Sequence, residues 1–260
     1  KPQAGRYRQL HQIGFEILGG IEDSIYDAQT VIATLRLIEE LKIKNLSVKI
    51  NSIGCGNCRT AYRRSLQGYY RRRQKDICGD CQNRLSANPL RLLDCKNDKC
   101  QEIKAESPSI IDYLCASCRS HFRSVLEYLD EAGVAYVLDP HLVRGLDYYN
   151  RTVFEIFAEG FESSLAGGGR YDYLAEMLGV RKGSLPAVGV SLGAERLIET
   201  MNVQGINNLV SFRPKIFLVQ IGKPAKKKAL KLIEDFRRAG LKVGESLGKE
   251  SLKVQLKIAD

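Results

Sequence analysis

The sequence predicts a mixed α/β (α+β) fold, and three patterns support this prediction. Strand-like and helix-like segments alternate along most of the chain. A cysteine-rich, mainly helical stretch over residues 55–134 interrupts the alternation, so we interpret it as an insertion. After a linker at residues 201–212, a strand–helix–strand–helix order predicts a smaller α/β domain.

The first part of the chain, residues 1–54, predicts strand, helix and strand. Polar and apolar residues alternate over residues 8–18, which is typical of a strand with Gln12 and Glu16 on one face. Residues 23–41 place apolar side chains at helical spacing, and residues 46–51 form a second predicted strand.

The part of the chain from residue 117 onward predicts a further series of helices and strands. A helix is predicted over residues 117–132, at the end of the insertion, and strands are predicted over residues 134–138 and 152–157. Between these strands lies Leu142-Val143-Arg144-Gly145-Leu146-Asp147-Tyr148-Tyr149, and a glycine-rich segment follows at residues 166–172. Residues 186–198 read as a strand that runs into a helix.

The C-terminal pattern predicts a strand over 215–221, a helix over 225–239, a strand over 241–244 and a last helix from Ser251.

Composition excludes several protein classes. The chain has 260 residues, of which 44% are apolar and 27% charged, so disorder and a collagen-like structure are excluded. No segment approaches the roughly 18 consecutive apolar residues of a membrane helix, and no signal peptide is visible. We therefore expect a cytoplasmic protein without membrane contact, and the start at Lys1 without an initiator Met suggests a cut N-terminus.

The net charge of +10 is concentrated at one end. Residues 213–260 hold 13 Lys and Arg against 5 Asp and Glu, a net charge of +8. Such a basic region favours contact with a polyanion, although a solvated lysine-rich helix face gives the same pattern.

Eight cysteines fall into four close pairs. Three of the pairs have the C-x-x-C spacing, which lets two thiolates bind one tetrahedral ion, so four pairs could form two structural zinc sites. Four thiolates leave no open position for catalysis. Buried free cysteines and a redox dithiol are the alternatives. The candidate ligands are Cys55, Cys58, Cys78, Cys81, Cys95, Cys100, Cys115 and Cys118.

Several of these segments together resemble histidyl-tRNA synthetase, a class II aminoacyl-tRNA synthetase. Residues 142–149 are similar to its histidine-specific motif, residues 2–16 to the loop and second strand of motif 2, residues 166–172 to its glycine-rich strand, and residues 189–197 to motif 3. The resemblance extends through Asn88-Pro89-Leu90-Arg91 and the basic C-terminal region. It implies an antiparallel-sheet catalytic core in residues 1–54 and 135–209, with the insertion at 55–134 and a truncated anticodon-binding domain at 213–260. The chain would then be an internal fragment that lacks motif 1 and the ends of both terminal domains.

The resemblance implies a two-step reaction. Histidine and ATP, with Mg²⁺, give histidyl-adenylate, and the 3′ end of tRNA(His) then accepts the histidyl group. Arg144 would be catalytic, between the substrate carboxylate and the α-phosphate, unless it forms a structural salt bridge to Asp147 or another acid. The implied histidine-binding residues are Gln12, Glu16, Arg144, Tyr148, Tyr149 and Tyr171.

Other residues are expected to bind ATP and tRNA. Arg6 and Arg196 would contact ATP, where the alternative for Arg196 is a helix-surface pair with Glu195. Arg71, Arg72 and Arg73 would contact tRNA, unless they cover a solvated helix face. The resemblance also implies a homodimer in the intact protein. Two other functions stay open: a regulatory paralogue that partners ATP phosphoribosyltransferase, and a non-catalytic zinc-dependent RNA-binding protein.

Overall fold

The computed structural model describes residues 8–20, 22–161, 163–180, 182–206, 214 and 216–260. The chain forms two compact units, residues 1–207 and residues 208–260. Within the described residues, no helix is both long enough and apolar enough to span a membrane.

The first unit is built on a six-stranded sheet. The strand order is β1-β6-β5-β4-β2-β3, and every neighbouring pair is antiparallel except β2 and β3. The predicted mixed fold with an antiparallel core is therefore confirmed. The strands are β1 (Gln12–Leu18), β2 (Leu46–Ser52), β3 (Tyr136–Leu138), β4 (Asn150–Ala158), β5 (Ala166–Arg170) and β6 (Ala187–Gly193).

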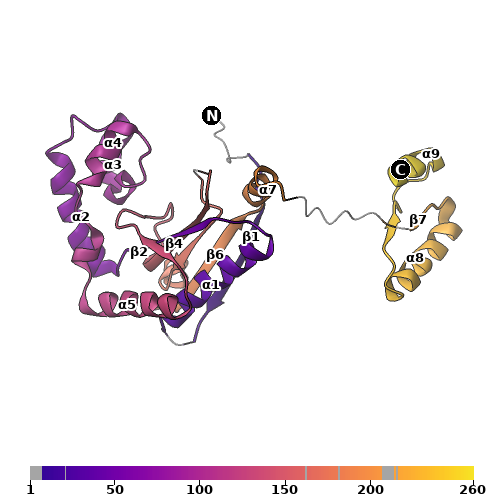
Figure 1. Cartoon of the computed structure of the whole chain (residues 1–260), viewed down its shortest axis with the longest axis horizontal. Coiled ribbons are helices and arrows are strands. Elements are labelled where there is room, and N and C mark those ends of the chain that lie inside the picture. Colours follow the sequence, from indigo (N-terminus) through magenta and orange to yellow (C-terminus); the bar gives the residue numbers. More distant parts are fainter. Residues whose placement is uncertain (1–7, 21, 162, 181, 207–213, 215) are drawn as a thin grey trace. The chain divides into compact units, whose positions relative to one another are not determined.

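Two helices cover one face of this sheet. Helices α1 (Ile25–Glu40) and α5 (Ala116–Glu131) lie side by side along it (Figure 1). Their buried apolar residues form one core with those of β4 and β6. Helix α5, the last part of the predicted insertion, packs Phe122, Val125 and Leu129 at helical spacing into this core.

The rest of the insertion projects away from the sheet. Figure 1 shows α2 as its stem and α3 and α4 at its far end. Its helices and 3₁₀ turns are α2 (Gly56–Arg71), α3 (Gly79–Ala87), η1 (Pro89–Leu92), α4 (Asp98–Ala105) and η2 (Ile110–Tyr113). The predicted mainly helical character is thus confirmed.

Two short helices complete the first unit. Helix α6 (Leu174–Met177) follows β5, and α7 (Ala194–Val203) follows β6 directly. The predicted linker at 201–212 begins too early, because α7 continues to Val203 and buries Thr200. Residues 207–213 of that linker lie outside the described residues.

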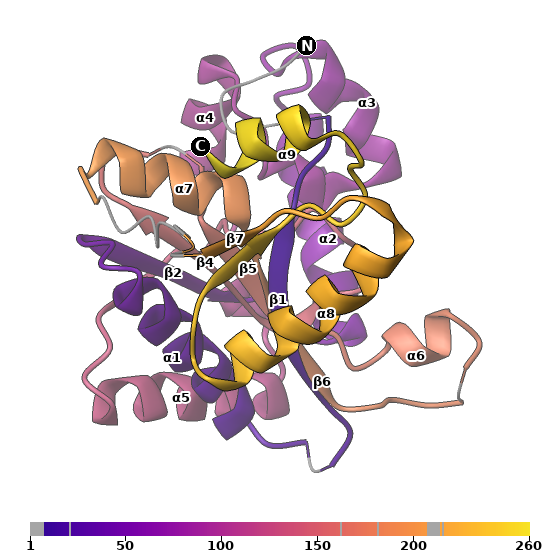
Figure 2. The same ribbon diagram turned by 90° about the vertical axis from the view of Figure 1, so that its right-hand side faces the viewer.

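The second unit is a βαβ element followed by a helix. Strands β7 (Ile216–Leu218) and β8 (Val243–Glu245) pair in parallel and are joined by α8 (Gly222–Arg238), which Figure 2 shows in full. Helix α9 (Leu252–Ala259) follows, and its buried Gln255 exchanges hydrogen bonds with the backbone of Gln220. Helix α8 begins three residues earlier than predicted, because Pro224 is tolerated in a first turn.

Candidate active site

The strand register decides which side chains share the face opposite α1 and α5. Glu155 on β4 lies opposite Gly167 on β5, which lies opposite Ser191 on β6. Glu16 on β1 lies opposite Gly189 on β6. Because side chains alternate along a strand, these five residues lie on one face, while the apolar residues between them face the helices.

Two glycines on this face let side chains lie directly on the sheet. A Cβ atom on Gly167 would overlap the guanidinium of Arg144. A Cβ atom on Gly189 would lie 2.8 Å from Cγ of Glu16 and 2.8 Å from Oη of Tyr171. Real Cβ atoms do not approach so closely, so the glycines make room for functional groups that would otherwise be displaced.

Arg144 lies over this floor with an acidic partner. Its guanidinium forms an ion pair with Glu155, and both side chains are about one-fifth exposed, at 21% and 19%. Burial raises the pKa of Glu155, while Arg144 acts in the opposite direction. The acid partner is thus a strand carboxylate and not Asp147, whose side chain accepts a hydrogen bond from Asn88 at 2.9 Å.

A cleft of about 580 Å³ opens above the glycine floor. Gln12, Arg144 and Arg196 line it, so the structure brings these three predicted residues together. Three lining residues that sequence reasoning missed are Glu155, Asp94 and Lys96. Glu155 could have been found as the only charged residue in the predicted strand 152–157, whereas nothing in the sequence connects Asp94 and Lys96, from the insertion, with this sheet.

Arg196 is held at the cleft by the start of α7. Its Nη1 donates to the carbonyl oxygen of Ser164 at 2.6 Å. Its sequence neighbour Glu195 instead binds His11, with 2.6 Å between Oε1 and the ring Nδ1 and with the backbone N–H of His11 donating to both carboxylate oxygens. These contacts lower the pKa of Glu195 and join the start of β1 to α7.

Three tyrosines form a cluster next to Arg144. The ring centroids of Tyr148 and Tyr149 are 4.7 Å apart, and that of Tyr171 lies 5.8 Å and 6.2 Å from them. The Arg144 guanidinium is 5.9 Å from the Tyr149 ring centroid. Burial and the neighbouring Glu16 carboxylate raise the pKa of Tyr171, and burial and Tyr149 raise that of Tyr148 to about 12. The three predicted tyrosines therefore lie together beside Arg144, and the Tyr171 phenol lies next to the Glu16 carboxylate.

A buried ion network holds the strand end that carries Tyr171. Arg170 is only 1% exposed and donates from Nε to Asp27 at 3.0 Å and from Nη1 to Asp172 at 3.1 Å. Asp172 also accepts from Asn150 at 2.8 Å. Burial would raise the pKa of Asp27, but hydrogen bonds from His121 and Arg170 lower it below 3.8. The charged residues of the glycine-rich segment are thus structural, which its sequence alone does not reveal.

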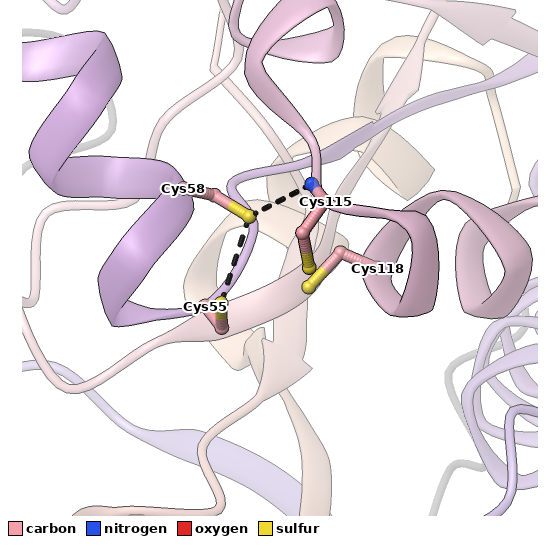
Figure 3. A group of neighbouring side chains, drawn as sticks. All are labelled: Cys55, Cys58, Cys115 and Cys118. Atoms are coloured by element: carbon pink, nitrogen blue, oxygen red, sulfur yellow. Dashed lines mark hydrogen bonds between the residues drawn. The ribbon is translucent and has the colours of Figure 1, made fainter.

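The eight cysteines form two groups of four that are nested in the sequence. In each group all four Sγ atoms lie within 4.8 Å of one another. Figure 3 shows the first group, in which the start of α2 meets the start of α5. The sequence left this pairing open. The groups are Cys55, Cys58, Cys115 and Cys118, and Cys78, Cys81, Cys95 and Cys100.

The sulfur geometry fits a tetrahedral thiophilic ion. A tetrahedron with Zn–S bonds of about 2.3 Å has S–S edges of about 3.8 Å. The Cys55 and Cys58 sulfurs are 3.6 Å apart and those of Cys78 and Cys95 are 3.8 Å apart. Burial would raise the pKa of Cys55, but N–H groups of Cys58 and its neighbour, with nearby thiols, lower it to about 7.

The predicted tRNA-binding arginines lie apart from the cleft, at the end of α2. Arg71 and Arg72 are exposed. Arg73 is half-buried, because its guanidinium lies 4.0 Å from the Tyr69 ring centroid and 3.8 Å from the Glu106 carboxylate. Arg6, a predicted ATP ligand, lies outside the described residues.

Comparison with known proteins supports the resemblance. A family model described as histidyl-tRNA synthetase matches residues 86–197. Proteins named histidine–tRNA ligase from Desulforamulus reducens and Halothermothrix orenii are 42% and 43% identical to the chain, over 261 and 262 residues. Both matches cover 100% of this chain and 62% of the relative, so the chain spans about three-fifths of those proteins.

Solved structures agree with the sequence matches. The crystal structure of apo S. aureus histidyl-tRNA synthetase matches with a TM-score of 0.66 and 32% identity, covering 98% of this chain and 63% of that one. A histidyl-tRNA synthetase from Nostoc sp. PCC 7120, at 22% identity and a TM-score of 0.54, has the same fold. By sequence and by fold, the chain is similar to histidyl-tRNA synthetases over nearly its whole length.

Proposed function

We propose that this chain carries the active site of a cytoplasmic histidine–tRNA ligase that works as a homodimer in its intact form. It would activate L-histidine with ATP and Mg²⁺ and pass the histidyl group to the 3′ end of tRNA(His). One observation carries the proposal. The same face of the sheet holds a cleft with two arginines and, directly beside it, a tyrosine cluster with one carboxylate.

The arginines suit the first chemical step. Attack of the histidine carboxylate on the α-phosphorus places negative charge on phosphate oxygens, and fixed cations stabilise that charge. Arg144, held over Gly167 by Glu155, is our candidate for the α-phosphate and the substrate carboxylate. Arg196, which also lines the cleft, is our candidate for the γ-phosphate.

The tyrosine cluster suits selection of an imidazole ring. A site whose polar groups each need a partner rejects side chains that leave those groups unpaired. Glu16 can accept from one ring nitrogen, and Tyr149 and Tyr171 can donate to or accept from the other, with Tyr148 packed against both rings. Gln12, at the start of the same strand, would bind the backbone of the amino acid.

We further propose that each cysteine group binds one structural Zn²⁺. The donor set of four thiols and the sulfur separations support this assignment. Bound zinc would cross-link α2 to α5 at the root of the insertion and would tie its far end together. Four protein ligands fill the coordination sphere, so these ions would hold the insertion in shape.

The tRNA contacts are proposed for two basic regions. Arg71 and Arg72 are exposed at the end of the stem helix, whereas Arg73 is already engaged by Tyr69 and Glu106. The C-terminal unit adds the basic helix α8. Lysine and arginine contacts of this type bind phosphates and give affinity with little sequence information.

The proposal is tested by ATP–pyrophosphate exchange with each amino acid in turn, on this chain and on the gene extended to the length of its relatives. We expect exchange with histidine only, lost in Glu16→Ala and kept in Glu127→Ala, which removes an exposed carboxylate from α5.

Other outcomes would favour the alternatives. Histidine binding without exchange in the extended protein would favour the regulatory paralogue. Binding of RNA but not histidine would favour the zinc-dependent RNA-binding protein.

A further inference from the structure

The loop at residues 142–149 carries Arg144, Tyr148 and Tyr149, yet it has no regular structure of its own. It lies between β3 and β4 and makes no strand pairing. An irregular segment keeps one conformation only if its polar groups find partners elsewhere. Two partners lie on the sheet, Asn51 of β2 for the carbonyl oxygen of Leu142 and Glu155 of β4 for Arg144, and three more come from the insertion.

The segment Asn88–Leu92 supplies two of these partners. The side-chain amide of Asn88 donates to Oδ1 of Asp147 at 2.9 Å. The guanidinium of Arg91 donates to the carbonyl oxygen of Gly145, which lies so close that a Cβ atom there would be 3.2 Å from Arg91 Nη1. The two donors thus bind the first and last residues of the tripeptide Gly145–Asp147 that follows Arg144.

The stem helix supplies a third partner. Nη1 of Arg59 on α2 donates to the carbonyl oxygens of Asp147 at 3.3 Å and of Tyr149 at 3.0 Å. Burial lowers the pKa of Arg59 most strongly, and the nearby Asp147 opposes this effect. Arg59 follows Cys58 directly in the sequence, so the root of the insertion positions it.

The 3₁₀ turn η1 explains why Asn88 and Arg91 act together. In a 3₁₀ helix, side chains three residues apart lie on the same side. Asn88 directly precedes η1, and its carbonyl oxygen accepts from the N–H of Arg91 at 3.1 Å, so both side chains reach the loop from one turn. Asp94, three residues further on, lines the cleft and lies 3.9 Å from Arg91. Leu90 and Leu93 occupy the other side and are buried.

Apolar packing joins the two segments as well. Leu90 and Leu92 share one buried cluster with Leu142 and Tyr149. The segment and the loop are therefore in contact through both polar and apolar groups. Nothing in the reaction chemistry uses Asn88 or Arg91 directly.

We infer that Asn88 and Arg91, with Arg59, are positioning residues that hold the loop 142–149 in the conformation that binds histidine. The inference rests on the proposed function for its effect on ligand binding, but its structural part does not. Loss of the Asn88 or Arg91 contact should loosen the loop, while the sheet and the stem helix stay folded.

The sharpest test reverses one hydrogen bond. Asn88→Asp keeps the side-chain shape but places a carboxylate against Asp147, so the bond is lost. In the double variant Asn88→Asp/Asp147→Asn the new amide at 147 can donate to the new carboxylate at 88, so the bond returns with its direction reversed. The control is Asn83→Asp, the same chemical change at an exposed position of α3.

Hydrogen–deuterium exchange of the whole chain measures how well ordered the loop is. In Asn88→Asp we expect peptides over residues 142–149 to exchange about tenfold faster, peptides over α2 and β4 to stay unchanged, and the double variant to return toward the wild-type rate. Arg91→Ala should loosen the same peptides, and Arg91→Lys should do so less because one donor remains. Unchanged exchange in both Asn88→Asp and Arg91→Ala would overturn the inference, as would a double variant without recovery.

Calorimetric titration with L-histidine then connects the loop to the ligand. We expect the histidine Kd to rise about tenfold in Asn88→Asp, in proportion to the lost order, and to recover in the double variant. A loop that loosens without any change in histidine affinity would overturn the positioning role. A wild-type chain that binds no histidine would instead count against the proposed function, and the exchange experiment would still decide whether the insertion holds the loop.

Discussion

The sheet of the first unit and its insertion achieve order in different ways. The sheet buries apolar residues of four of its strands under two sixteen-residue helices and adds a fully buried ion network around Arg170. The insertion combines the sixteen-residue stem helix α2 with two shorter helices and two 3₁₀ turns around an apolar cluster of its own, and eight cysteines lie in it or at its root. Both regions therefore bury apolar residues, but the far end of the insertion is built on helices of nine and eight residues, to which metal cross-links would add most stability.

The two regions nevertheless meet at the site. Asn88, Arg91 and Arg59 of the insertion contact the loop that carries Arg144, and Asp94 lines the cleft. A defect in the insertion should therefore reach the active site while the sheet remains folded. The following predictions separate these two kinds of order.

Removal of metal should have the largest effect. Structural zinc in small domains contributes about 10–16 kcal/mol of apparent binding energy at neutral pH, which exceeds what a few short helices gain by packing. Treatment of the zinc-loaded protein with a strong chelator should abolish hydrogen-exchange protection in α2, α3 and α4 and leave β4, β5 and β6 protected. Protein purified without zinc, with all thiols titrating freely, would contradict this prediction.

Single ligand substitutions sharpen the same test. Cys78→Ser should release the far end of the insertion only, because its three partners lie in that end. Cys115→Ser should loosen the junction of α2 and α5. One bound zinc in each variant, against two in the wild type, is the expected metal analysis.

Substitution within the buried ion network should unfold the sheet instead. Asp27→Asn removes the charge that Arg170 needs in a site where both side chains are almost fully buried. Breaking a buried pair in this way typically costs about 3–5 kcal/mol. Urea unfolding should show this loss, whereas Glu127→Gln on the exposed side of α5 should change little.

Acid should weaken the same network. The pKa of Asp27 lies below its ordinary value of 3.8 in the folded chain, so the folded state favours the ionised form. Its contribution to stability is complete above the unfolded-state pKa and is lost as the pH falls through the lower folded-state pKa. The free energy of unfolding of the wild type should therefore fall more steeply below about pH 4 than that of Asp27→Asn. Equal slopes in both proteins would contradict the assignment.

Gly167→Ala should damage activity and spare the fold. The new methyl group meets the flexible end of Arg144, which must leave the glycine floor. Loss of one fixed charge stabiliser lowers kcat by about 100-fold or more, so partial displacement should lower histidine-dependent exchange by about 10- to 100-fold. Gly68→Ala, where no atom lies within 4 Å of the new Cβ, is the control and should keep full activity.

Charge reversal at the end of the stem helix should have the smallest effect. Changing Arg71, Arg72 and Arg73 to Glu should raise the KM for tRNA by about tenfold and leave pyrophosphate exchange unchanged. Arg73→Glu alone should contribute least, because Arg73 is already engaged by Glu106. Arg123→Glu, on the exposed side of α5, is the matched control, and an unchanged KM in the triple variant would refute the assignment.

Strand-like patterns predicted five of the six strands and the shared face of Gln12 and Glu16, whereas β5 read as a glycine-rich segment that only the resemblance linked to a strand. Local periodicity could not show that the last helix of the cysteine-rich region packs on the sheet, because both a free and a docked amphipathic helix have the same spacing. It also could not place Arg170 and Asp27 together, since their contact joins residues far apart in the sequence.

The candidate site shows the same division. Motif similarity selected Arg144, Tyr149 and Tyr171, and the structure brings these residues together. Glu155 was missed although it is the only charged residue of its predicted strand, because its contact with Arg144 depends on strand register. Asp94 and Asn88 were missed because their contacts join the insertion to the sheet and the loop, which only tertiary structure reveals. The cysteine pairing was left open for the same reason, because spacing alone allows several combinations.

Whether the tyrosine cluster and the cleft form one active site is tested most directly by calorimetry. The measurement compares the binding of L-histidine, ATP and a stable analogue of histidyl-adenylate to the same protein. If the tyrosine cluster and the arginine-lined cleft adjoin as one site, the linked analogue should bind about 100-fold more tightly than either single ligand, since the second contact becomes intramolecular. An analogue that binds no more tightly than histidine, or one that is matched by the adenylate analogue of another amino acid, would contradict the account.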